Sequence, residues 1–167
     1  MVNLGAPHEL AAAAGADSEG VGLFRTEFLY LDRASAPGAE EQREAYRQVF
    51  EAFAGRRVVV RTLDAGADKP LPFATTADEP NPALGVRGLR TSVRHPGLLD
   101  TQLAAVAEAA RSTGADAWVM APMVSVPAEA RAFAEQARRT GCPRSARWSR
   151  SRRRRCAPGS WPRCATS

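Results

Sequence analysis

The chain alternates short apolar runs with segments that have the spacing of amphipathic helices. The apolar runs lie near residues 2, 21, 58 and 118. These runs are apolar throughout, which is typical of strands in a sheet that is covered on both faces. Strands that alternate with helices indicate a parallel sheet joined by right-handed crossovers.

A segment with a helical pattern follows each of the four runs. Residues 8–15 are rich in alanine, residues 40–54 and 98–110 place apolar side chains at helical spacing, and the last segment covers residues 127–139. The resulting order, β-α-β-α-β-α-β-α, is compatible with two α/β folds. One is the first four βα units of a (β/α)8 TIM barrel, and the other is a doubly wound sheet.

The excess of basic residues is confined to the end of the chain. Residues 141–167 hold eight arginines and no acidic residue, and subtracting these eight charges from the net charge of +5 leaves −3 for residues 1–140. From Gly141 onward, Arg, Ser, Pro, Cys and Trp replace the earlier Ala, Val, Leu and Glu, and no helical or strand period remains. We therefore expect one folded domain in residues 1–140 and a disordered, arginine-rich tail in residues 141–167.

Two interpretations of this tail stay open. An arginine-rich segment is typical of proteins that bind nucleic acid. The same composition arises when a GC-rich gene is read in a shifted frame, so that the tail is not native sequence. The composition favours this second interpretation.

The sequence does not indicate a membrane or secreted protein. It has no apolar run of the roughly 20 residues that a bilayer-spanning helix needs, and no secretory signal heads the chain. All three cysteines lie in the tail, at spacings that match no common zinc or redox motif. We expect a cytoplasmic protein with reduced thiols.

Two consecutive apolar runs end in the same dipeptide, Arg-Thr, at Arg25 and Arg61. Because the carboxyl ends of parallel strands meet at one edge of the sheet, both guanidinium groups are expected to face one crevice, which suits a phosphate or a carboxylate. The alternative is that each arginine pairs with a carboxylate at the rim, Arg25 with Glu27 or Asp64. The sequence thus predicts an anion site, with structural ion pairs as the alternative.

Further candidate residues follow the strand ends. Asp64 and Lys69 bound a glycine-containing loop, in which Lys69 is either a third cation or part of a solvated turn. Arg87 lies between two glycines, downstream of Asn81, and Met123 follows the last strand, where it closes the core or walls a pocket. The sequence contains no Ser-His-Asp set, no cluster of metal ligands and no Walker-type phosphate loop.

Four blocks of the sequence resemble, in order and spacing, the PEP-binding barrel of the Enzyme I family. These are the phosphoenolpyruvate-protein phosphotransferases of the bacterial sugar phosphotransferase system. The blocks are residues 20–30, 60–69, 81–87 and 120–123, and the resemblance covers residues 2 to about 140. Pyruvate phosphate dikinase and PEP synthase share the barrel, and a fragment of that type is the alternative, although the Arg-Thr-Glu-Phe-Leu block is more similar to Enzyme I.

The resemblance implies a (β/α)8 barrel that binds PEP and Mg²⁺ at its C-terminal mouth. Arg25 and Arg61 match the two family arginines that hold the PEP phosphate, and Arg87 matches a third arginine near it. In the family, the phosphoryl group passes to a histidine of a separate domain and then to the carrier protein HPr, and the barrel forms a homodimer. Candidate pocket residues are Asp64, Lys69, Asn81 and Met123.

The chain also departs from the family pattern. The Glu and Asp that bind Mg²⁺, the Asn-Asp motif, the enolate-protonating cysteine and the phosphohistidine domain have no counterpart here, so we assign no catalytic or metal-binding residue. We expect a chain that binds the PEP phosphate, is not competent for turnover alone and has an incomplete dimer interface. The alternatives from other classes are nucleic-acid binding by the tail and a non-functional remnant with two open sheet edges.

Overall fold

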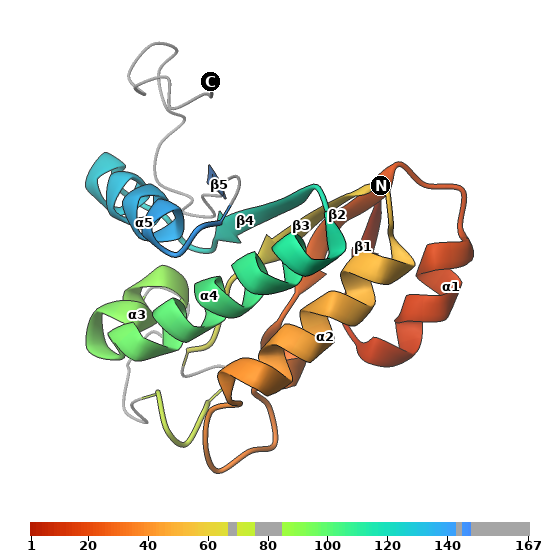
Figure 1. The fold of residues 1–167 in the computed structure, drawn as a ribbon. Helices are drawn as coiled ribbons and strands as arrows, with labels where there is room; N and C mark the ends of the chain where they lie inside the picture. Colours follow the sequence, from red (N-terminus) through yellow and green to blue (C-terminus); the bar gives the residue numbers. More distant parts are fainter. Residues whose placement is uncertain (67–69, 76–84, 143–144, 148–167) are drawn as a thin grey trace.

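A parallel sheet lies at the centre of the molecule (Figure 1). The computed structural model describes residues 1–66, 70–75, 85–142 and 145–147 of the chain. The strands are β1 (Val2–Leu4), β2 (Gly20–Arg25), β3 (Arg57–Arg61), β4 (Ala117–Ala121) and β5 (Ser145–Arg147). All neighbouring strands pair in parallel, and their order in the sheet is β1-β2-β3-β4-β5.

Helices connect the strands. The α-helices are α1 (Leu10–Gly15), α2 (Ala39–Ala52), α3 (Thr91–Arg94), α4 (Pro96–Thr113) and α5 (Pro127–Arg139). Short 3-10 helices are η1 (Pro7–Glu9), η2 (Glu27–Leu29) and η3 (Gly88–Arg90). Within the described residues, no helix is both long and apolar enough to cross a membrane.

The strand order decides between the two folds that the sequence allows. Since the order in the sheet equals the order in the chain, right-handed crossovers all run in the same direction and place their helices on the same face. Figure 1 shows α1, α2 and α4 side by side over one face of the sheet. A doubly wound sheet reverses its strand order at a switch point, which the described strands do not do. The arrangement is a parallel α/β sheet that is consistent with part of a TIM-barrel wall.

The core lies between the sheet and this helix layer. Val58 and Val60 of β3 are in register with Ala117 and Val119 of β4, and each of these side chains is at most 1% exposed. The helices α2 and α4 contribute the buried side chains Tyr46, Val49, Phe50, Leu99, Leu103 and Val106. The apolar stripes that predicted these two helices are therefore the faces that they bury against the sheet.

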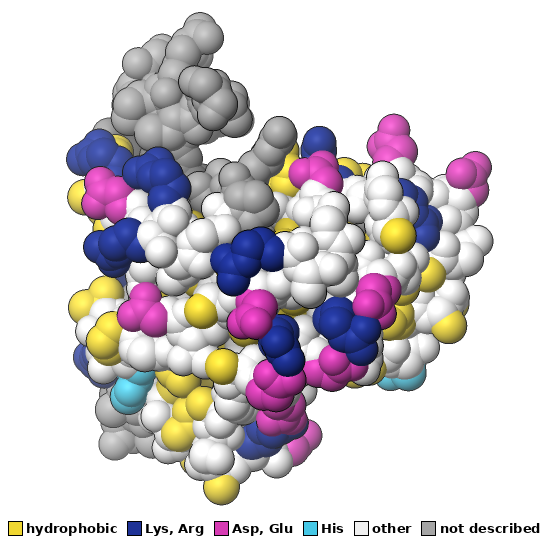
Figure 2. Space-filling view, in the orientation of Figure 1, with side chains coloured by type: hydrophobic (Ala, Val, Ile, Leu, Met, Phe, Trp, Pro, Cys, Tyr) yellow, Lys and Arg dark blue, Asp and Glu magenta, His cyan; other side chains and the backbone are white. Residues whose placement is uncertain are grey.

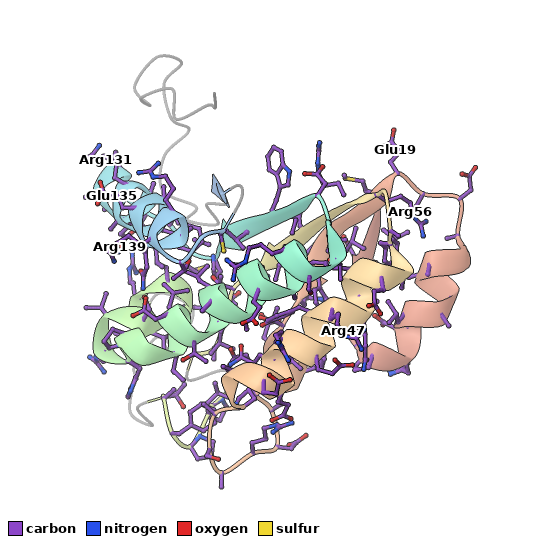
Figure 3. The ribbon with its side chains drawn as sticks, viewed as in Figure 1. Glu19, Arg47, Arg56, Arg131, Glu135 and Arg139 are labelled. Carbon is purple, nitrogen blue, oxygen red and sulfur yellow. The ribbon has the colours of Figure 1, made fainter. Side chains whose placement is uncertain are left out.

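The outer face of the helix layer carries paired charges, which Figure 2 shows as adjacent dark blue and magenta side chains. Arg43 of α2 contacts Glu40 and lies 3.0 Å from Glu108 of α4. Arg47, labelled in Figure 3, lies 2.7 Å from Glu44, and its hydrogen bonds lower the pKa of that carboxyl to about 2. These side chains are exposed to solvent, and exposed pairs of this kind contribute little to stability.

The structure confirms the strands and helices that the sequence predicts and adjusts some of their ends. The first helix begins at Leu10 because Pro7–Glu9 forms η1, and α4 begins at Pro96, where a proline fits the first turn. The helix α3 was not predicted, since Thr91–Arg94 is too short to show an apolar period.

The structure describes two short parts of the predicted tail, residues 141–142 and 145–147. Cys142 is 6% exposed, its thiol donates a hydrogen bond to the carbonyl of Leu103 at 3.3 Å, and burial raises the thiol pKa to about 11. Ser145–Arg147 forms β5, because the outer edge of β4 offers backbone groups that pair with another strand whatever its side chains are. Residues 148–167, which include most of the tail arginines, lie outside the described residues.

Candidate functional site

The carboxyl ends of β2, β3 and β4 bring the sequence-predicted arginines together. Arg25 of β2 is the register partner of Arg61 in β3, and Arg61 is in turn the partner of Met120 in β4. Figure 3 labels Glu19 and Arg56, which directly precede β2 and β3 and so mark the amino ends of these strands, opposite the arginines. The convergence of the two Arg-Thr strand ends, inferred from the sequence, is therefore present in the fold.

Arg61 is buried and lies among carboxylates. Its Nη2 donates a hydrogen bond to Oε1 of Glu27 in η2, and its Nη1 lies 3.6 Å from Oδ2 of Asp64. The side chains of Arg61, Glu27 and Asp64 are only 7–8% exposed. The alternative of structural ion pairs therefore holds for Arg61, which pairs with both Glu27 and Asp64. The expected pairing of Arg25 with Glu27 or Asp64 is not seen among the described contacts.

Arg87 joins the same group of charges. Its Nε lies 3.3 Å from Oδ1 of Asp64, and its side chain is 13% exposed. Asp64 thus bridges two arginines. Together with Glu27 these residues form a largely buried set of two cations and two carboxylates, which we call the arginine cluster (Glu27, Arg61, Asp64, Arg87). Buried charges of opposite sign hold one another in fixed positions, because separating them would leave an unpaired charge in a low-dielectric environment.

Within the part of the chain that the structure describes, two buried atoms of the arginine cluster have no hydrogen-bond partner. They are Nε of Arg61 and Oε2 of Glu27, both of which are buried. An unpaired buried donor is costly, and such groups in folded proteins usually have a partner in a bound molecule or a water. Nε of Arg61 is therefore a buried donor that is unsatisfied within the described residues and that a ligand oxygen entering the cluster would satisfy.

Arg25 differs from the other two arginines because its side chain is exposed. It lies against the backbone of Gly5, where a Cβ would come within 2.7 Å of its Nη2. The backbone N–H groups of Gly5 and Ala6 lower the pKa of Glu9, and the charge of Arg25 adds to this effect. Arg25 thus carries its charge at the solvent side of the strand ends.

Met123 lies next to the turn that carries Arg87. Its φ of 61° is unusual for a residue other than glycine, and backbone strain of this kind is common at functional sites. It packs against Gly88, where a Cβ would lie 3.0 Å from Cγ of Met123, and the N–H of Leu89 donates to the carbonyl of Pro122 at 3.2 Å. Two further predicted residues, Lys69 and Asn81, lie outside the described residues.

A small pocket lies behind the end of β3, beside the arginine cluster. Thr62, Leu63, Leu89 and Gln102 are among its lining residues, and none of the three arginines lines it. The predicted site residues did not include Gln102 or Thr26, which hold the strand ends from inside the core. The signal for Gln102 was present in the sequence, since it is a polar residue within the apolar stripe of α4.

The described residues do not form a metal site. They contain no group of three or more His, Cys, Asp or Glu side chains that could hold an ion. The two carboxylates at the strand ends, Glu27 and Asp64, are engaged by arginines. A divalent cation prefers several oxygen ligands, so these two groups do not fit Mg²⁺ by themselves.

Comparison with known proteins identifies the family. Residues 1–142 match the family model described as PEP-utilising enzyme, PEP-binding domain. The chain belongs to this family. The resemblance seen in the four sequence blocks is thereby confirmed.

The relatives of this PEP-binding domain are phosphotransferases. It is 60% identical over 142 residues to the phosphoenolpyruvate-protein phosphotransferase of Streptomyces coelicolor, covering 84% of this chain and 26% of that protein. It is 50% identical over 136 residues to the protein of the same name from Haloferax volcanii, covering 80% of this chain and 24% of that protein. The multiphosphoryl transfer protein of Shigella flexneri is 46% identical over 124 residues, which are 74% of this chain and 15% of that protein. The chain thus spans about a quarter or less of these relatives.

Proposed function

We propose that this PEP-binding domain binds the phosphate of PEP with Arg25, Arg61 and Arg87 at the carboxyl ends of β2 and β3. The observation that carries the proposal is that Arg25 and Arg61 are register partners in neighbouring strands. Asp64 pairs with both Arg61 and Arg87 and so brings Arg87 to the same place. Phosphoryl transfer depends on fixed cations that neutralise the phosphate oxygens and hold the donor in line. Three guanidinium groups at one sheet edge meet this requirement.

The arginines have different tasks in this proposal. Arg61 keeps two of its nitrogens on Glu27 and Asp64 and offers its unpaired Nε to a phosphate oxygen. Arg25, which is exposed, contributes a charge at the entrance. Glu27 and Asp64 do not contact the phosphate, because like charges repel, and instead fix the guanidinium planes. Met123, together with Lys69 and Asn81, is proposed to line the pocket around the carboxyl end of PEP.

The complete reaction needs groups from outside this chain. The family resemblance implies Mg²⁺, which would neutralise the charge of bound PEP, and its ligands would have to come from other segments, since Glu27 and Asp64 are engaged by arginines. The names of the relatives support a role in phosphotransfer to a protein. We propose that the acceptor histidine lies on a separate domain, that HPr follows it, and that the chain alone does not turn over.

Several wider expectations belong to the same proposal. The parallel sheet is proposed to be half of an eight-unit barrel, in a cytoplasmic protein of the sugar phosphotransferase system. The homodimer of the family is expected only if the remaining barrel segments are supplied. Figure 1 shows β1 at one end of the sheet and β5 at the other, and these are the two edges at which such segments would pair.

A PEP titration of the complete chain, followed by NMR with and without Mg²⁺, tests the proposal. We expect weak, saturable binding that shifts the side-chain N–H signals of arginine. Arg25→Met should remove most of the affinity because it removes a phosphate contact. The matched control is Arg57→Met, at the opposite end of β3, where Arg57 pairs with Asp116. Equal loss of affinity in both variants, or no binding by the unaltered chain, would show that the proposed site is wrong.

A further inference from the structure

A glutamine from the core joins the two strand ends that carry Arg25 and Arg61. Gln102 lies on α4 and is 1% exposed. We propose that Gln102 is a positioning residue, which holds the ends of β2 and β3 in the register that lets their arginines share one phosphate. This inference rests on the proposed function, because it concerns the arrangement of the same arginines.

The amide of Gln102 is fully engaged as a donor and also accepts a hydrogen bond. Its Nε2 donates to Oγ1 of Thr26 and to the hydroxyl of Tyr46, both at 3.0 Å. Its Oε1 accepts the backbone N–H of Leu63 at 2.9 Å. Thr26 directly follows Arg25, and Leu63 lies two residues after Arg61, so one side chain contacts the backbone segments that leave both strands.

Thr26 completes the connection to Arg61. Its hydroxyl accepts from Gln102 and donates to the backbone carbonyl of Arg61 at 2.9 Å. Thr26 is 0% exposed, so this bond is shielded from water. The hydrogen bonds therefore run in one direction, from the amide of Gln102 to the hydroxyl of Thr26 and from there to the carbonyl of Arg61. Arg61 is the residue whose guanidinium is proposed to hold the phosphate. Buried networks with every member satisfied are rigid, because breaking one bond leaves an unpaired polar group.

This connection matters because the geometry of a phosphate site is demanding. A displacement of about 1 Å in a positioning group can reduce activity by about 100-fold. The register of β2 with β3 ends at the pair Arg25 and Arg61, so these two strands no longer pair with each other beyond it, although the N–H of Thr62 still donates to the carbonyl of Met120 in β4 at 2.9 Å. Gln102 and Thr26 supply hydrogen bonds at this point, where the pairing of β2 with β3 no longer does.

A second buried glutamine serves as a matched control. Gln42 of α2 is also 1% exposed. It accepts hydrogen bonds from the hydroxyls of Tyr30 at 2.8 Å and Tyr46 at 3.3 Å, and it donates to the carbonyl of Pro37 at 3.0 Å. The two glutamines therefore match in burial, in helical setting and in the number of hydrogen bonds. They share one partner, the hydroxyl of Tyr46, but of the two only Gln102 bonds the segments that follow Arg25 and Arg61.

The experiment compares Gln102→Met with Gln42→Met in the complete chain. Urea unfolding measures the stability of each variant, and NMR titration with PEP measures affinity and the PEP-induced shift of the Arg61 Nε–H signal. We expect similar losses of stability in the two variants. Affinity for PEP should fall about tenfold or more in Gln102→Met and change less than about twofold in Gln42→Met. The amide of Leu63 should exchange with solvent faster only in Gln102→Met.

A second variant guards against a failure of Gln102→Met to fold. Thr26→Val is nearly isosteric and removes the hydrogen bond to Arg61 while it leaves the contact of Gln102 with Leu63, so PEP affinity should fall here too. If the unaltered chain binds PEP and both variants bind it as tightly, the inference is wrong and the proposed function stands. If the unaltered chain does not bind PEP, the proposed function is wrong and the positioning role falls with it.

Discussion

At the scale of single residues, the pair of Arg61 and Glu27 is the most consequential contact of the site. Both side chains are nearly buried, and one carboxylate oxygen of Glu27 has no hydrogen bond to any described residue. Burying two charges costs solvation energy, so the pair itself is weak evidence of stability. Removing only one partner is costly, because it leaves an uncompensated charge in the core.

We therefore predict that Arg61→Met lowers the free energy of unfolding by about 3–5 kcal/mol. Adding Glu27→Leu should recover most of this loss, since two apolar side chains then replace the ion pair. Urea denaturation of the two single variants and the double variant measures the effect. Losses that simply add in the double variant would contradict the prediction.

A second residue-scale prediction concerns Gly88, beside Arg87. Its φ is +57°, and an added Cβ would lie 3.0 Å from Cγ of Met123 and 3.1 Å from the carbonyl oxygen of Pro122. Gly88→Ala should cost about 1–2 kcal/mol for the left-handed backbone, with a further loss from this overlap. Gly114→Ala is the control, because Gly114 has a φ of +67° and no neighbouring atom within 4 Å. Equal losses in urea denaturation would show that Met123 and Pro122 do not crowd this position.

At the scale of secondary-structure elements, the start of α5 is held by Glu129. Its Oε2 accepts the backbone N–H groups of Ser125 at 2.7 Å and Val126 at 3.1 Å, and its Oε1 lies 3.3 Å from Nε of Arg90. Partial burial raises the pKa of Glu129, but these hydrogen bonds and the charge of Arg90 together lower the pKa by more than burial raises it. The net shift of the pKa is therefore downward. The carboxylate therefore connects α5 to η3, which follows directly after Arg87.

The lowered pKa fixes the sign of a pH effect. The unfolded chain binds a proton at Glu129 more readily than the folded chain, so the stabilisation is complete above the unfolded pKa of about 4.3 and is lost as the pH falls through the lower folded pKa. The difference in unfolding free energy between the unaltered chain and Glu129→Gln should thus shrink as the pH falls below about 5. Thermal or urea unfolding across this range measures it, and a pH-independent difference would refute the assignment.

The elements also show what sequence patterns can and cannot predict. The strands β2, β3 and β4 follow from apolar runs that stop at Arg25, Arg61 and Ala121, since a run buried on both faces has a clear compositional signature. The strand β5 has no such signature and depends on the open edge of β4. The helix α3 is one turn long, and no period can be recognised over four residues.

At the scale of the whole molecule, the packed part of the chain extends past the change in composition at residue 141. We propose that the domain boundary lies close after residue 147, rather than at residue 140 as the composition suggests, because Cys142 is buried and β5 pairs with β4. The described contacts of the site all lie in residues 1–142, which is also the span of the family match.

Two shortened chains test this boundary. A chain that ends at residue 147 should keep its unfolding free energy within about 0.5 kcal/mol of the complete chain. A chain that ends at residue 140 should lose about 1–3 kcal/mol, because it lacks the buried Cys142 and the pairing of β5. Urea denaturation with unchanged m-values compares them. A large loss on removal of residues 148–167 alone would place the boundary later in the chain.

The sequence by itself determined the order of strands and helices, the family, and the two Arg-Thr strand ends, because each depends on local composition and spacing. Only the tertiary structure decided which charges meet. Glu27 lies two residues from Arg25 in the chain but pairs with Arg61, since η2 turns it toward the neighbouring strand. The role of Gln102 was hidden for the same reason, because its partners Thr26 and Leu63 are 76 and 39 residues away and meet it only in the folded core.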